Sequence, residues 1–318
     1  MIVEGIVQFN IIIMSAESSE QLEAEGTEDE VCASCGTAAV DDVKLKKCAC
    51  NLVKYCSVDC QKSDRPKHKR ACRKELAEIH DKELFEQPDG THEGDCPICF
   101  LPLPLDMKKS SFHSCCCKSM CDGCVYADYL SNGGNRCPFC REPNVSGEEQ
   151  HNKRVMERVK ANDPAALYQM SSRRHREGNY DKAVEYLRKA AELGNSEAHY
   201  TLGTIYVKGQ FVDKDEEKAI YHYEKAAIGG HPKARHNLAI IEGKNGNFER
   251  AVKHLIIAAN LGYEESMKAL WNVFSCGNIT KEELDVTLRG HQAAIDATKS
   301  AQRDAAEAYY RRASASQP

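Results

Sequence analysis

The clearest pattern of hydrophobic and polar positions lies in the second half of the chain, where apolar residues recur at a regular interval. The motifs AAELG, AAIGG and AANLG begin at residues 190, 226 and 258, so the unit repeats after 36 and then 32 residues. Four columns of matching residues keep these offsets: Ala166, Ala198, Ala234 and Ser266; Met170, Leu202, Leu238 and Leu270; Ala183, Ala219 and Ala251; and Leu187, Tyr223 and Leu255. Each unit predicts two helices joined by a turn. One such pair cannot bury its own apolar face, so the pattern predicts an all-α helix–turn–helix repeat solenoid.

Local residues mark where these helices begin and end. Asp163 followed by Pro164 is typical of a helix start. Gly194, Gly230 and Gly262 stand where the end of a helix favours a left-handed residue. The second unit carries four extra residues within KGQFVDKDEEKA.

The repeats resemble the Sel1-like family, a branch of the tetratricopeptide-like helical repeats. The segment KGQFVDKDEEKAIYHYEKAAIGG matches the family's glycine, aspartate, Lys-Ala and Ala-Ala-x-x-Gly positions. The resemblance covers about residues 164–284 and implies a scaffold that binds other proteins. Trp271 and Cys276 fall in its last unit, and we expect both to be in the core.

The segments between and around the patterned regions predict linkers and tails. Residues 1–31 are expected to form a disordered segment, acidic from residue 15 onward, and we interpret Met14 as the true start of translation. The apolar start of 13 residues is too short to span a membrane. Residues 73–95 predict a helical linker that ends near Pro88, residues 142–163 a polar linker, and residues 285–318 a C-terminal helix or charged tail.

Composition narrows the chemistry. A net charge of −5 gives no global attraction to nucleic acid or to a membrane, so we expect neither as a partner. Of the 17 cysteines, all but Cys276 lie between Cys32 and Cys140. No secretory signal is evident, so we expect an intracellular protein, cytoplasmic or nuclear, in a compartment where disulfides are rare. Metal ligation is therefore the better interpretation of the cysteines.

The first cysteine block, residues 32–72, resembles a MYND zinc finger through YCSVDCQ, Asp64 and HKRAC. Eight donors are enough for two four-coordinate zinc ions. The resemblance implies that the two sites interleave: Cys32, Cys35, Cys56 and Cys60 would hold one ion, and Cys48, Cys50, His68 and Cys72 the other. Cys50 departs from the family spacing, and Arg65 replaces the usual tryptophan of the peptide groove. Eleven Lys and Arg residues in 44–74 are compatible with nucleic-acid binding, but a solvated basic face is the preferred interpretation.

The second block, residues 96–141, contains three Cys-x2-Cys pairs and resembles a RING finger. The resemblance implies one site made of Cys96, Cys99, Cys121 and Cys124. The other would combine Cys137 and Cys140 with two of the adjacent Cys115, Cys116 and Cys117, where the RING pattern has a cysteine and a histidine. Cys115 with Cys117 is preferred, Cys116 is a close alternative, and His113 is a further candidate. Together the two blocks predict small zinc-stabilised, cross-braced modules that bind four zinc ions per chain.

A RING finger does no covalent chemistry, so we assign no catalytic residue. It would position a ubiquitin-conjugating enzyme, and Ile98, Pro138 and Arg141 match the positions that contact that enzyme in the family. The first hypothesis is a RING-type ubiquitin ligase whose repeats recruit the substrate. The alternative is a non-enzymatic adaptor in which the zinc fingers and repeats only bind proteins.

Overall fold

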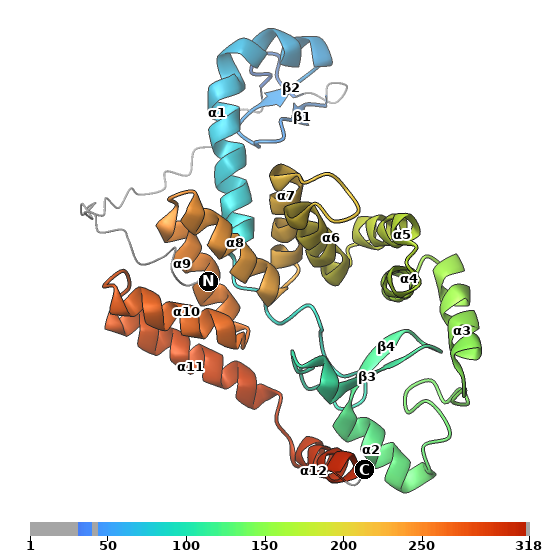
Figure 1. The fold of residues 1–318 in the computed structure, drawn as a ribbon. Helices are drawn as coiled ribbons and strands as arrows, with labels where there is room; N and C mark the ends of the chain where they lie inside the picture. Colours follow the sequence, from blue (N-terminus) through green and yellow to red (C-terminus); the bar gives the residue numbers. More distant parts are fainter. Residues whose placement is uncertain (1–30, 40–43, 316–318) are drawn as a thin grey trace. The chain divides into compact units, whose positions relative to one another are not determined.

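The structure is a computed structural model that describes residues 31–39 and 44–315. The chain divides into two compact units, Met1–Glu86 and Gln87–Pro318 (Figure 1). Except for Val31, the acidic segment expected over residues 1–31 lies outside the described residues, and so does the proposed start at Met14.

The first unit consists of a short hairpin and one long helix. Strand β1 (Lys46–Lys47) pairs antiparallel with β2 (Lys54–Tyr55). Helix α1 (Val58–Phe85) follows and spans 28 residues. Its N-cap is Ser57, whose hydroxyl accepts the backbone N–H of Cys60 at 3.2 Å.

Helix α1 extends beyond the first cysteine block. The helical part of the linker predicted over residues 73–95 is the C-terminal part of α1 and not a separate element. No Gly or Pro lies between Cys72 and Pro88, so nothing in the sequence interrupts the helix there. Leu84 is fully buried, whereas Leu76 and Ile79 are exposed.

The second unit begins with the second cysteine block. Strands β3 (Ser110–His113) and β4 (Lys118–Cys121) form an antiparallel hairpin after a short 3-10 turn, η1 (Met107–Lys109). Helix α2 (Asp122–Asn132) follows directly. Part of the expected polar linker 142–163 is helical: it contains α3 (Glu148–Lys160), which packs against the first repeat helix.

The solenoid consists of consecutive helices that pack mainly against their chain neighbours (Figure 1). The helices are α4 (Pro164–Arg176), α5 (Tyr180–Glu192), α6 (Ser196–Lys208), α7 (Glu216–Ile228), α8 (Pro232–Lys244), α9 (Phe248–Asn260), α10 (Glu264–Ser275) and α11 (Lys281–Ala297). This architecture confirms the predicted fold class: cysteine-rich metal modules followed by a helical repeat solenoid.

Burial of the aligned columns explains why the repeat pattern exists. The first-helix column of Ala166, Ala198, Ala234 and Ser266 is fully buried, and its leucine and methionine column is at most 2% exposed. Gly194, Gly230 and Gly262 have φ values of 82°, 77° and 85°, as the helix ends require. Asp163 accepts the backbone N–H groups of Ala165 and Ala166 at 3.0 and 3.2 Å.

The last part of the chain departs from expectation. Trp271 is 47% exposed and Cys276 is also exposed, so neither belongs to the core. The predicted C-terminal helix or tail comprises the end of α11 and a separate helix, α12 (Ala301–Ala315), which packs against α2. Among the described helices, none is both long and apolar enough to cross a membrane.

Candidate metal centres

The first cysteine block brings its eight donors together in two groups of four. Within each group the donor atoms lie within 4.8 Å of one another: Cys32, Cys35, Cys56 and Cys60 form one, and Cys48, Cys50, His68 and Cys72 the other. These are the two sets that the MYND resemblance implies, and Cys50 takes its place despite the departure in spacing. Its Sγ lies 3.1 Å from His68 Nε2.

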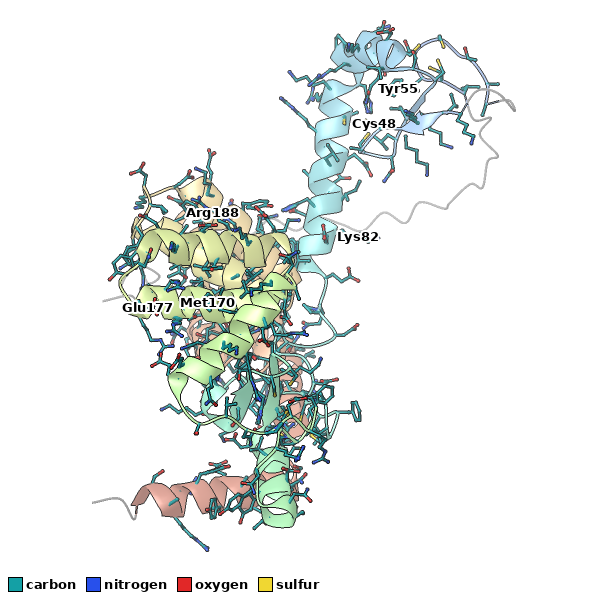
Figure 2. The ribbon with its side chains drawn as sticks, turned by 90° about the vertical axis from the view of Figure 1, so that its right-hand side faces the viewer. Cys48, Tyr55, Lys82, Met170, Glu177 and Arg188 are labelled. Atoms are coloured by element: carbon teal, nitrogen blue, oxygen red, sulfur yellow. The ribbon has the colours of Figure 1, made fainter. Side chains whose placement is uncertain are left out.

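Helix α1 supplies ligands to both groups. Cys60, Asp64, His68 and Cys72 are spaced by four residues, which returns each side chain to nearly the same helix face. Asp64 fills the non-ligand position of this stripe and accepts a hydrogen bond of 2.7 Å from the buried Tyr55 hydroxyl. Burial, followed by Asp64, raises the pKa of Tyr55 above its usual range. Figure 2 shows Tyr55 and Cys48 beside α1, where this bond ties the hairpin to the helix.

The second cysteine block forms two further groups. One contains Cys96, Cys99, Cys121 and Cys124, as expected. The other contains Cys115, Cys116, Cys137 and Cys140. Successive cysteine pairs along the chain belong alternately to one group and to the other, which is the interleaved arrangement that a RING finger implies.

The structure departs from the preferred assignment at Cys117. Because His113 pairs with Lys118, residues 114–117 form the hairpin turn, and Cys117 ends it with a left-handed φ of 51°. Its side chain packs with Val155, Ala166 and Met170, beneath α3 and α4. This burial raises the pKa of the Cys117 thiol to about 11.

Cys116 takes the place expected for Cys117. Its Sγ lies 3.9 Å from that of Cys137, and the Sγ atoms of Cys115 and Cys140 are 3.3 Å apart. His113 is in the hairpin and outside the metal-binding group. Lys118, which takes the RING histidine position when Cys116 is counted as the third ligand, places its Nζ 5.4 Å from the centre of the Phe139 ring.

The turns that carry the cysteine pairs share one backbone geometry. In the pair Cys96–Cys99, the N–H of Phe100 donates to the Cys96 carbonyl at 2.9 Å, and Phe100 is left-handed with φ of 57°. Arg141 repeats this after Cys140, with a bond of 3.0 Å to the Cys137 carbonyl and φ of 63°. A non-glycine residue with positive φ is uncommon, so two in equivalent places indicate that the turns form to hold the thiols.

The separations between donors fit zinc and exclude disulfides. Ligands about 2.3 Å from a tetrahedral zinc ion are roughly 3.8 Å apart. Neighbouring sulfurs in the first block are 3.5, 3.6 and 3.7 Å apart, whereas a disulfide needs about 2.05 Å. Four such donors in each group, nearly all sulfur, are the ligand chemistry of structural zinc sites.

Hydrogen-bond donors lower the pKa of some of these thiols, whereas burial and neighbouring thiols raise that of others, such as Cys72. The backbone N–H of Cys56 is the main cause that lowers the pKa of Cys32 to about 6. Burial alone would raise the pKa of Cys99, but the N–H of Leu101 and the guanidinium of Arg303 outweigh it and lower the pKa to about 7. Because the thiolate is the form that binds metal, such donors favour the loaded state.

The three residues expected to contact a conjugating enzyme all reach the surface. Ile98 is 36% exposed and Pro138 is half-buried. The Arg141 side chain is 62% exposed, and its Nη1 donates to Asp128 Oδ1 of α2 at 2.9 Å. Phe100 and Phe139, which the sequence reasoning did not select, are 75% and 42% exposed on the same two turns.

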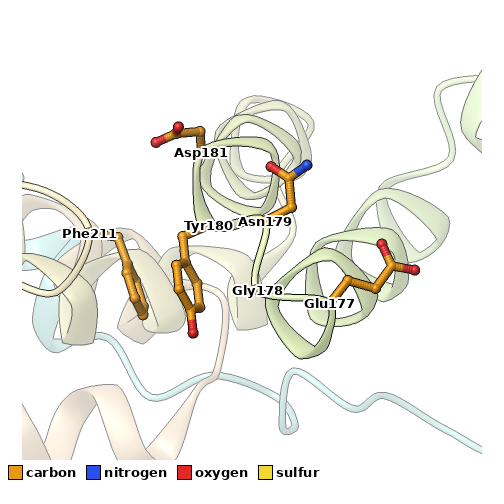
Figure 3. A pocket seen from close by; sticks show the side chains of 6 residues that line it. All are labelled: Glu177, Gly178, Asn179, Tyr180, Asp181 and Phe211. Atoms are coloured by element: carbon orange, nitrogen blue, oxygen red, sulfur yellow. The ribbon is translucent and has the colours of Figure 1, made fainter.

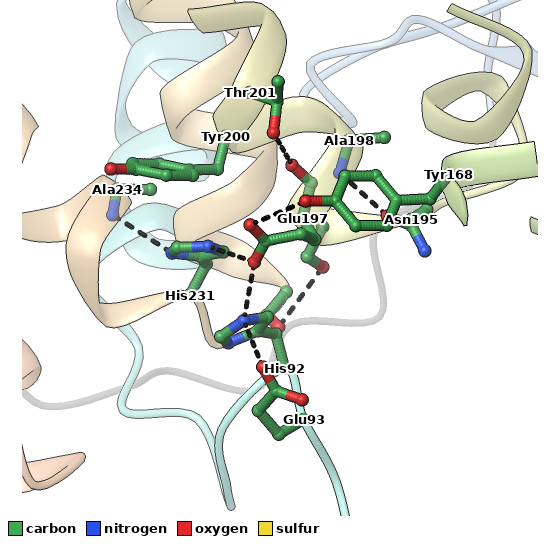
Figure 4. A network of polar contacts seen from close by, with 12 residues as sticks. His92, Glu93, Tyr168, Asn195, Glu197, Ala198, Tyr200, Thr201, His231 and Ala234 are labelled. Atoms are coloured by element: carbon green, nitrogen blue, oxygen red, sulfur yellow. Dashed lines mark hydrogen bonds and ion pairs between the residues drawn. The ribbon is translucent and has the colours of Figure 1, made fainter. Parts of the chain in front are cut away.

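A cluster of histidines and carboxylates joins the linker before Cys96 to the repeats, and sequence reasoning missed it (Figure 4). Glu197 Oε2 lies 3.1 Å from His92 Nε2 and 3.0 Å from His231 Nε2. The rings of His92 and His231 stack with centroids 3.9 Å apart, and the backbone N–H of His92 donates to the Gly230 carbonyl. The only sequence signal was a histidine at position 231, where the earlier units have the N-cap residues Asp163 and Asn195.

This cluster does not fit a metal ion. His231 Nδ1 accepts the backbone N–H of Ala234 at 3.2 Å, so the ring proton is on Nε2, the atom that faces Glu197. Burial lowers the pKa of His231, which keeps it neutral. Burial alone would also lower the pKa of His92, but bonds to Glu197 and Glu93 outweigh it and raise the pKa to about 9. The cluster is therefore an ion-paired clasp between linker and repeats.

A surface hollow of about 480 Å³ lies between the first and second repeats (Figure 3). The rings of Tyr180 and Phe211 stack at its edge with centroids 3.9 Å apart, and both are about 40% exposed. Phe211 belongs to the segment that contains the four extra residues of the second unit. The residues that line the hollow are Glu177, Gly178, Asn179, Tyr180, Asp181 and Phe211.

Cysteine-rich metal modules joined to a helical solenoid define a class of protein-interaction scaffolds. Comparison with known families agrees: the MYND finger matches residues 32–72, and the Sel1 repeat matches residues 164–195, 196–231 and 232–263. The chain therefore contains Sel1 repeats and a MYND finger. Neither match extends to residues 96–141.

Several solved structures are similar to this chain. A Sel1 repeat protein from Oxalobacter formigenes is 31% identical over 37% of this chain and 95% of its own, with a TM-score of 0.35. A protective antigen of uropathogenic Escherichia coli with an SLR fold is 24% identical over 53% of this chain and 37% of its own, with a TM-score of 0.41. An immunity protein from Pseudomonas aeruginosa is 17% identical over 58% of this chain and 82% of its own, with a TM-score of 0.27.

Proposed function

We propose that the protein is a RING-type ubiquitin ligase in which residues 96–141 dock a ubiquitin-conjugating enzyme and the Sel1 repeats recruit the substrate. In this proposal four zinc ions support the fold, bound by the four groups of donors described above. Cys116 replaces Cys117 among the sixteen ligands.

The observation that carries the proposal is the pair of equivalent turns, Cys96–Phe100 and Cys137–Arg141. Each turn places a cysteine pair in a different metal group and exposes apolar side chains, Ile98 and Phe100 on one and Phe139 on the other. Exposed apolar residues on rigid, metal-held turns suit the docking of another protein.

Catalysis by such a module would consist of positioning. The ubiquitin thioester belongs to the conjugating enzyme, and a lysine of the substrate attacks it. The module would hold the conjugating enzyme so that the thioester is oriented for that attack. Arg141, which hydrogen-bonds α2 through Asp128, would place its remaining N–H groups toward the docked proteins.

The test is discharge of ubiquitin from a panel of charged conjugating enzymes by the full-length, zinc-loaded protein. Ile98→Ala and Arg141→Ala should each reduce discharge at least tenfold with an unchanged zinc content. Val286→Ala, at an exposed site on α11, is the matched control and should leave it unchanged. If no enzyme of the panel is discharged, the ligase proposal fails.

The alternative is a non-enzymatic adaptor, and one observation favours it. Lys118 stands where a RING finger has a ligand histidine, and the second metal group is completed by adjacent cysteines instead. In that case the zinc modules and repeats would only bind proteins, for example at the hollow beside Tyr180 and Phe211. A stable complex with a conjugating enzyme would count against the adaptor.

A further inference from the structure

The last helix of the chain packs onto the metal module, although about 200 residues separate them in sequence. Arg303, near the start of α12, donates from Nη1 to the Pro102 carbonyl at 2.7 Å and from Nη2 to the Leu101 carbonyl at 3.2 Å. Nη2 also lies 3.5 Å from Cys99 Sγ. One guanidinium therefore holds the chain that follows Cys99 and donates toward the ligand sulfur itself.

Further contacts hold α12 against η1 and α2. Lys109 Nζ pairs with Glu307 at 3.0 Å, and the rings of Tyr126 and Tyr309 stack with centroids 4.7 Å apart. At Gly123 there is no room for a side chain, because a Cβ there would lie 2.9 Å from the backbone nitrogen of Arg303. The close approach depends on this glycine, which follows the ligand Cys121 by two residues.

The chemistry of the site explains why an arginine suits this place. Four thiolates around one zinc ion leave a net negative charge, and N–H groups directed at the sulfurs stabilise it. The planar guanidinium can meet a sulfur and two carbonyls at once, which a lysine ammonium at the end of a flexible stem cannot reproduce.

We propose that Arg303 is a positioning residue of the Cys96, Cys99, Cys121 and Cys124 centre, and that α12 completes the metal module. Arg303 retains zinc by holding Cys99 and the Leu101–Pro102 chain in the ligating conformation. It also fixes the turn that presents Ile98 and Phe100. This second consequence rests on the proposed ligase function, whereas zinc retention does not.

The experiment measures zinc release from the full-length protein to a metallochromic chelator. Arg303→Gln should release one of the bound zinc ions about tenfold faster, since loss of a residue that supports a ligand typically costs ten- to a hundredfold in metal affinity. Arg303→Lys should fall between Arg303→Gln and the wild type. Arg289→Gln is the control, because Arg289 is an exposed arginine of the preceding helix α11.

A spectroscopic readout separates positioning from general stability. In cobalt-substituted protein, Arg303→Gln should shift the sulfur-to-cobalt charge-transfer band of one centre, because an N–H donor to Cys99 is lost. Gly123→Ala, which displaces α12 without removing the arginine, should speed release in the same way and serves if Arg303→Gln does not fold. Release rates and cobalt spectra equal to the wild type in both variants would overturn the proposal. Because neither readout uses ubiquitin, failure of the ligase assay would leave this result intact.

Discussion

Replacing Cys116 with alanine should remove one zinc ion from the protein, whereas the same change at its neighbour Cys117 should remove none. The structure places Cys116 Sγ 3.9 Å from Cys137 Sγ and buries Cys117 among Val155, Ala166 and Met170. The two variants remove the same atom from adjacent residues, so each is the control for the other.

The two variants should affect different quantities, zinc affinity in Cys116→Ala and folding stability in Cys117→Ala. A structural zinc site contributes about 10–16 kcal/mol, so one ligand in four accounts for roughly 2.5–4 kcal/mol if the shares are equal. Cys116→Ala should therefore weaken that site by about two to three orders of magnitude. Cys117→Ala should cost only about 1 kcal/mol of stability, because it leaves a small gap in an apolar cluster.

The assay is zinc content per chain by mass spectrometry after dialysis against a weak chelator, with circular dichroism to verify folding. We expect four zinc ions in the wild type and in Cys117→Ala, and three in Cys116→Ala. The opposite pattern, a loss at Cys117 and none at Cys116, would refute the assignment and indicate ligation by Cys115 and Cys117.

Three further predictions concern the rest of the molecule. Removing zinc with a strong chelator should unfold the metal modules, while the far-ultraviolet circular dichroism of the repeats persists, because the buried repeat columns contain no metal ligand. Loss of nearly all helical signal would contradict this prediction. Gly230→Ala should lower the melting temperature by clearly more than Gly194→Ala. Both glycines have positive φ, but only at Gly230 would the new Cβ meet another segment, 2.5 Å from the Gly90 carbonyl oxygen. Equal shifts in melting temperature would show that the linker does not pack there. The His92 clasp, which faces Glu93, Glu197 and His231, should be fully formed below the ordinary pKa of 6.5 and weaken as pH rises through about 9, because its folded pKa is raised. The protection factors of the 90–94 amides, which correct for the intrinsic rise of exchange with pH, should fall over that range in the wild type but stay constant in His92→Gln.

The sequence predicted those parts that depend on local patterns. Repeating alanine and leucine columns identify buried faces whatever the exact arrangement of neighbours, so the solenoid could be read from positions such as Ala198 and Leu202. Cysteine spacing identified the candidate ligands for the same reason. At the hairpin, however, three consecutive cysteines are candidates for two ligand positions, and the sequence does not distinguish them. The backbone conformation does, because the left-handed φ of Cys117 turns its side chain away from the metal group.

Contacts between distant segments could not be predicted in this way. The pairing of His92 with Glu197 and of Arg303 with the Cys99 turn joins residues 105 and 204 positions apart, and no periodic pattern marks either. Exposed Trp271 illustrates the opposite error, because an apolar residue in a repeat helix need not face the core.

These two distant contacts anchor the second metal module on both sides of its ligands. His92 fixes the chain four residues before Cys96, and Arg303 fixes the chain just after Cys99. If α12 helps to retain zinc, thermodynamic linkage requires that zinc also helps to retain α12, by the same free energy. Removing the metal should therefore expose the surface of α2 that α12 covers, including Tyr126, so zinc loading and docking of the C-terminal helix form one equilibrium.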